Sequence, residues 1–133
     1  MKRTYFSFGV HYYKNNVPAT LRPFVDYRFS SGGITGDDYK TFEKKFKRVI
    51  GKLLPEGYSI HSWHSNHYAC SWVIKTSDDK FIYGSIPDVR CNVNEWFTNI
   101  LIRTMEHDKD FRGGFNRYTN IFKFKDDIKK LYI

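Results

Sequence analysis

The chain has 133 residues, of which 41% are apolar and 19% aromatic, so one folded domain spanning 1–133 can bury a core and intrinsic disorder is excluded. Its formal net charge is +8, and no run approaches the roughly 20 apolar residues of a membrane-spanning helix. Two cysteines, Cys70 and Cys91, are too few for a disulfide framework, so we expect reduced thiols in a cytoplasmic protein with no membrane partner; a Cys70–Cys91 bridge remains an alternative.

Two strands are predicted at the N-terminal end of the chain. Residues 5–13 alternate between two faces, and residues 14–16 favour a turn. Residues 25–29 form a second alternating run. Because Pro23 cannot donate a ladder hydrogen bond, this strand is expected to begin there or to lie at a sheet edge.

The first helix is predicted from its capping signal. Thr35 and Asp38 have the spacing of a capping box, and residues 55–57, Pro-Glu-Gly, stop the helix. The apolar residues between these signals form one stripe that can face a sheet: Phe42, Phe46, Val49, Ile50, Leu53 and Leu54.

The middle third is predicted to be a meander of three strands. Strands are expected at residues 58–63, 68–74 and 81–86, with a bend near Ser65 and Asn66 and a turn at residues 77–79. Cys70, Trp72 and Ile74 are in phase with Tyr68 and should pack against the helices.

A second helix is predicted to begin at Asn92, with Glu95 three residues later. Its buried face would carry Trp96, Phe97, Ile100, Leu101, Thr104 and Met105. The glycines at 113 and 114 predict a turn, followed by a short strand over 118–124 and a terminal helical turn over 126–133 that packs through Ile128 and Leu131.

Together these elements predict a single α+β domain with the order β-β-α-β-β-β-α-β and a terminal helical turn. The sheet should be mostly antiparallel, with about five to six strands and two main amphipathic helices on one face.

The positive charge is concentrated at both ends of the chain. Residues 1–57 carry 11 Lys and Arg against 5 Asp and Glu, and residues 112–133 carry 6 against 2. On the first helix, the arc opposite the apolar stripe carries Lys40, Lys44, Lys45, Lys47, Arg48 and Lys52. The C-terminal segment adds Arg112, Arg117, Lys123, Lys125, Lys129 and Lys130, with Phe122 and Phe124 alternating against lysines as on a strand.

Such basic faces suit a nucleic-acid backbone or an acidic protein surface, although a solubilising surface would look the same. Lysine outnumbers arginine, which favours point-charge contact with phosphate over reading of bases. Aromatic side chains could stack on single-stranded bases, but most of them are expected in the core, and the element order does not fit an RNA-recognition sheet.

His61, His64, His67 and Cys70 are spaced three apart and could suggest a metal site. On strands, however, residues three apart point to opposite faces, and no second ligand pair is present, so no metal is expected. General acid/base chemistry by the three histidines, with a cation stabilising phosphate, would instead make a metal-independent ribonuclease.

No phosphate-binding loop, dinucleotide fingerprint or nucleophile elbow is present, so no cofactor is expected.

The leading hypothesis is a non-catalytic binding protein whose basic faces engage nucleic acid or a nucleic-acid-handling protein complex. The composition also fits an accessory protein of a phage or mobile element that inhibits a host defence enzyme, by analogy only. The alternatives are the histidine-dependent ribonuclease and a module that recognises an acidic protein surface. Oligomeric state is left open.

Overall fold

The computed structural model describes residues 35–89, 99–112 and 114–132. These residues form a five-stranded antiparallel sheet and two helices, an α+β fold. The strands are β1 (Ser59–Asn66), β2 (Ala69–Lys75), β3 (Phe81–Ile86), β4 (Ile100–Met105) and β5 (Arg117–Thr119). They lie in the sheet in chain order, and the helices are α3 (Gly36–Lys52) and α4 (Phe124–Lys130). The expected fold class is confirmed, while the predicted strands at 5–13 and 25–29 lie outside the described residues.

Helix α3 begins where the capping signal places it. Thr35 accepts a hydrogen bond from the backbone of Asp38, and the Asp38 carboxylate accepts one from the backbone of Thr35. The reciprocal pair satisfies two amides that the first helical turn would otherwise leave open. The helix ends at Lys52, three residues before Pro55. Its predicted stripe is buried at Phe42, Phe46, Val49, Ile50 and Leu54, and Leu53 is partly buried.

The meander is also confirmed. Strand β3 covers the predicted residues, and the hairpin between β1 and β2 turns at His67 and Tyr68, just after the predicted bend. A bulge between Ile60 and Ser62 shifts the β1 register by one residue at His61. In the turn before β3, Asp79 has a positive φ of 63°.

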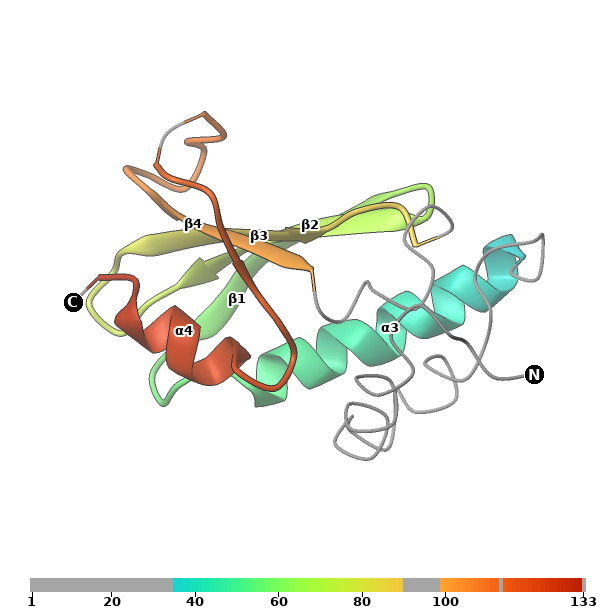
Figure 1. Cartoon of the computed structure of the whole chain (residues 1–133), viewed down its shortest axis with the longest axis horizontal. Coiled ribbons are helices and arrows are strands. Elements are labelled where there is room, and N and C mark those ends of the chain that lie inside the picture. The colour runs from blue at the N-terminus through green and yellow to red at the C-terminus, as the bar shows by residue number, and fades with distance from the viewer. Residues whose placement is uncertain (1–34, 90–98, 113, 133) are drawn as a thin grey trace.

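Both helices pack against the same face of the sheet (Figure 1). The Trp72 ring on β2 lies 5.7 Å from the Phe46 ring on α3 and 6.5 Å from the Phe124 ring on α4, measured between centroids. The core between the layers adds Ile82, Ile102 and other aliphatic side chains of the strands. The two helices that cover this face are α3 and the terminal helix α4.

The predicted second helix is wrong over residues 100–105, which form strand β4, paired with β3 and β5. Ile100 and Ile102 face the helices, while Arg103 and Met105 are buried on the opposite side. A strand buried on both faces has a nearly continuous apolar run that also fits a helical stripe, so periodicity could not separate the two. The predicted start at Asn92 lies outside the described residues.

The predicted strand over 118–124 is also shorter than expected. β5 ends at Thr119 because the Asn120 side chain accepts hydrogen bonds from the backbone of Phe122 and Lys123, each 2.9 Å long, and so bends the chain toward α4. Phe124 therefore enters α4 and the core, and Ile128 is buried with it, as predicted. Within the described residues, the second helix is therefore the terminal one.

The closest packing in the sheet is between Trp72 and Gly84, which are paired across β2 and β3. A Cβ atom added at Gly84 would lie 2.3 Å from Trp72 Nε1. The indole nitrogen is buried and has no hydrogen-bond partner among the described residues. The indole thus lies flat over a backbone position that only glycine leaves open.

We expect Gly84→Ala to lower the free energy of unfolding by roughly 1–3 kcal/mol, because the methyl group must displace a fully buried indole. Urea denaturation measures the loss. The matched control is Gly51→Ala on α3, where the nearest atom to an added Cβ is 3.8 Å away; it should be neutral or stabilising by up to about 1 kcal/mol. Equal stabilities of the two variants would contradict the packing described.

Candidate functional site

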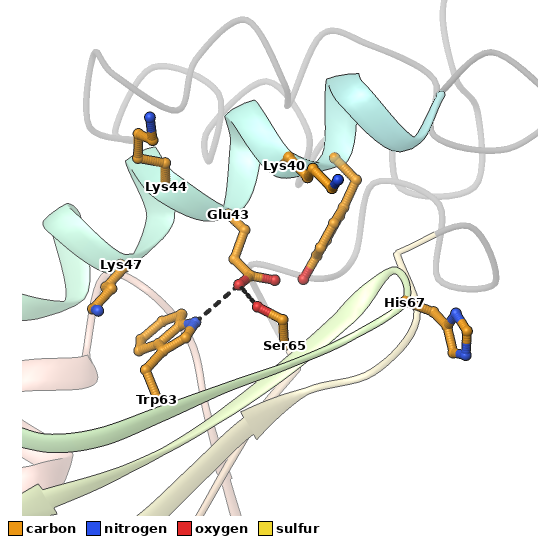
Figure 2. A pocket seen from close by; sticks show the side chains of 8 residues that line it. Lys40, Glu43, Lys44, Lys47, Trp63, Ser65 and His67 are labelled. Carbon is orange, nitrogen blue, oxygen red and sulfur yellow. Dashed lines mark hydrogen bonds between the residues drawn. The ribbon is translucent and has the colours of Figure 1, made fainter.

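A cleft of about 490 Å³ lies between α3 and the β1–β2 hairpin. We call it the basic cleft (Figure 2). Its lining residues are Tyr39, Lys40, Glu43, Lys44, Lys47, Trp63, Ser65 and His67. The helix supplies the charged side chains, and the hairpin supplies the opposite wall.

Three lysines border the cleft along α3. Lys40, Lys44 and Lys47 are separated by four and three residues, so they lie on one side of the helix, and all three are exposed. The Lys47 ammonium lies 5.7 Å from the centre of the Trp63 ring, within the range of a cation–π contact. The cleft therefore combines a row of cations with an aromatic wall.

Glu43 connects the helix to the hairpin. Its Oε2 atom accepts a hydrogen bond of 3.1 Å from Trp63 Nε1 and a second one from the Ser65 hydroxyl. Trp63 is fixed from its other side as well, since its ring stacks on Trp72 with 5.0 Å between centroids. These contacts give the wall of the cleft a defined position, and they place one carboxylate among the three lysines.

Tyr39, at the inner side of the cleft, is almost fully buried. Burial raises the pKa of its hydroxyl, and the neighbouring Cys70 and Glu43 side chains raise that pKa further. The phenol therefore stays neutral and adds no negative charge to the basic cleft.

A second, shallower hollow of about 210 Å³ adjoins the first on the outer surface of α3. It is lined by Lys40, Thr41, Lys44, Lys45 and Arg48. Lys45 is half-buried and engaged in a contact, whereas Arg48 is exposed. Five of the six cations predicted on this helix thus border the two hollows, and Lys52 is exposed in the last turn.

The four C-terminal lysines are exposed, but the strand arrangement predicted around Lys123 and Lys125 is wrong. Lys123 precedes α4, and the other three lie on that helix: Lys125, Lys129 and Lys130. They line neither hollow, although α4 packs on the same face of the sheet as α3 (Figure 1).

The three histidines do not converge. His61 Nε2 lies 3.1 Å from Asp108 Oδ2, and His64 is paired with Ser71 on the sheet face away from the helices. His67 lies at the hairpin turn with a positive φ of 58° and borders the basic cleft. Within residues 35–89, 99–112 and 114–132, no three His, Cys, Asp or Glu side chains gather as a metal site would require.

Cys70 is a free thiol buried under α3. Burial in apolar surroundings raises its pKa far above the ordinary thiol value, so the thiolate that nucleophilic chemistry needs is scarce. Cys91 lies outside the described residues.

Trp63, Glu43 and Ser65 were not predicted as site residues. The sequence could have predicted that Glu43 lies beside the lysines, because it is three residues after Lys40 and four before Lys47 on the same side of the helix. Nothing local to β1 marks Trp63 or Ser65, because their proximity to α3 results from packing between the two layers.

No protein family model, curated protein or solved structure matches this chain. Among the helices in the described part of the chain, none is long and apolar enough to cross a membrane.

The buried position of Cys70 predicts its reactivity. In a Cys91→Ser variant at pH 8, alkylation of Cys70 by iodoacetamide should be roughly 100-fold slower in the folded protein than in urea, because folding both shields the thiol and raises its pKa. Mass spectrometry over a time course measures both rates. Rapid labelling without urea would show that this part of the core opens readily.

Proposed function

We propose that the chain is a non-catalytic binding protein whose basic cleft engages the phosphate backbone of a nucleic acid. The observation that carries this proposal is the row of Lys40, Lys44 and Lys47 beside a cleft with a fixed aromatic wall. Arg48 and Lys45 extend the same positive surface around the helix.

The spacing of the row supports contact with successive phosphates. From Lys40 to Lys47 the helix rises by roughly 10 Å at 1.5 Å per residue. Along the axis of a duplex each strand rises by about 3.4 Å per phosphate, so the row spans the rise of a few phosphates. Lysine ammonium groups act as mobile point charges, which suits contact with phosphate of any sequence.

The histidine-dependent ribonuclease is less well supported. General acid/base catalysis requires its groups to lie around one reacting atom, whereas His61 is paired with Asp108 and His67 borders a cleft on the other side of the sheet. A nucleoprotein or acidic protein partner would use the same cations. The experiments below separate these partners from free nucleic acid.

We expect the Lys44→Gln/Lys47→Gln variant to bind duplex DNA more weakly, because two phosphate contacts are lost. The slope of log affinity against log salt should become shallower by roughly 1.8. Fluorescence anisotropy with a labelled 16-base-pair duplex between 25 and 200 mM KCl, as probe conditions, measures both quantities.

The matched control is Lys75→Gln/Lys80→Gln, which removes the same charge far from the cleft. Those lysines pair with Asp79 and Asp78 in the β2–β3 turn, so this variant should keep the wild-type slope. Equal losses in the two double variants would mean that only net charge matters. No binding by the wild-type protein at 25 mM KCl would reject nucleic acid as the ligand and favour an acidic protein surface.

Glu43→Gln should strengthen duplex binding by roughly three- to tenfold at low salt. The amide oxygen still accepts from Trp63 Nε1 and Ser65, while the negative charge among the three lysines is removed. Trp fluorescence and thermal melting verify that the cleft is intact. Unchanged affinity in a correctly folded variant would place the bound polyanion away from this cleft.

A further inference from the structure

The loop between β4 and β5 and the start of β5 expose three large aromatic side chains. Their exposed fractions are 51% for Phe111, 84% for Phe115 and 63% for Tyr118, and these are the large hydrophobic side chains that stand out as exposed in the described part of the chain. The loop extends on the side of the sheet opposite α3 and α4 (Figure 1). Together with Arg112, these residues form what we call the aromatic edge.

The loop that carries this edge is held in place by Asp110. Its carboxylate accepts backbone hydrogen bonds from Glu106 at 3.0 Å and Arg112 at 3.2 Å, and its carbonyl oxygen accepts one from Arg103. Gly114 has a positive φ of 80° and lies so close to β4 that an added Cβ would be 2.5 Å from the Thr104 carbonyl oxygen. The exposed rings are thus carried by an ordered scaffold.

Tyr83 and Tyr118 lie on one face of the sheet. Tyr118 pairs with Leu101, and Arg103, two residues further along β4, is paired with Tyr83 on the same face. The Arg103 guanidinium lies 4.5 Å from the centre of the Tyr83 ring, and the Phe111 ring meets Tyr83 edge-on at 6.1 Å. Tyr83 therefore contacts both the Arg103 guanidinium and the Phe111 ring at this end of the sheet.

The segment that carries the three exposed rings has a positive charge. From Phe111 to Tyr118 the chain contains two cations and no acidic residue; Arg112 lies on the loop with the rings, and Arg117 on the opposite face of β5 from Tyr118. Two nearby acids have partners, since Asp108 is close to His61 and the Asp110 carboxylate accepts backbone hydrogen bonds. An anionic ligand with flat apolar groups complements both properties.

We propose that the aromatic edge binds single-stranded nucleic acid by stacking unpaired bases on Phe115 and Tyr118 while Arg112 contacts a phosphate. Unpaired bases can stack on exposed aromatic rings while a nearby cation contacts the phosphate backbone. The bases of a duplex are already stacked on one another and cannot stack on these rings. This surface lies on the other side of the sheet from the basic cleft, and the inference does not rest on the function proposed for that cleft.

The test uses a short single-stranded oligonucleotide containing 2-aminopurine, whose fluorescence falls when the base stacks on an aromatic ring. Binding is measured for the full chain in the Lys44→Gln/Lys47→Gln background, which removes the contribution of the basic cleft. We expect quenching on binding, and a roughly tenfold weaker affinity for each of Phe115→Ala and Tyr118→Ala. Because both rings are highly exposed, thermal melting should show folded variants.

Tyr118→Phe is the matched control, because it keeps the ring and removes only the hydroxyl; its affinity should stay within about twofold of the parent. Duplex binding in the wild-type background should be unchanged by Phe115→Ala. Unaltered single-strand affinity in a Phe115→Ala/Tyr118→Ala double variant would overturn the inference and favour a protein ligand for the aromatic edge. If the Lys44→Gln/Lys47→Gln variant binds duplex DNA as tightly as the wild-type protein, that result contradicts the proposal for the basic cleft. It does not contradict the proposal for the aromatic edge.

Discussion

The indole of Trp72 is the contact on which the arrangement of both layers depends. It is fully buried on β2, and it lies between Phe46 of α3 and Phe124 of α4. On the strand side it covers the backbone of β3 at Gly84, where any larger residue would collide with it. A side chain of this size, placed against a glycine, sets how closely two helices can approach one sheet.

The basic cleft follows from the same contact. Trp63 stacks on Trp72, and this orientation directs its indole nitrogen to Glu43 on α3. The hairpin is thereby held beside the lysines of the helix. A perturbation at Gly84 would therefore reach the cleft through two stacked indoles, although Gly84 itself is remote from the charged residues.

The two sides of the sheet offer different chemistry. The helical side presents lysines beside a single indole, which suits long-range attraction to phosphate and depends strongly on salt. The side opposite the helices presents the exposed Phe111, Phe115 and Tyr118 rings with Arg112, and stacking acts at short range and is less sensitive to salt. One small domain could thus contact a nucleic acid in two distinct ways.

The sequence by itself determined the elements that local chemistry controls. The capping box at Thr35, the stripe on α3 and the turns of the meander were predictable because each depends on neighbouring residues. The set of cations on α3 was predictable for the same reason, since helical periodicity alone assigns them to one side.

Only the tertiary structure decided the remainder. Residues 100–105 are a strand because β3 and β5 pair with them, whereas their apolar run fits a helix equally well. Phe124 is buried because Asn120 bends the chain toward α4, whereas Phe115 in the loop before β5 is exposed, a difference that composition does not contain. The approach of Trp63 and Glu43 was likewise decided by packing between layers. Contacts between residues distant in the chain depend on which surfaces pack against one another, and local sequence patterns do not predict that packing.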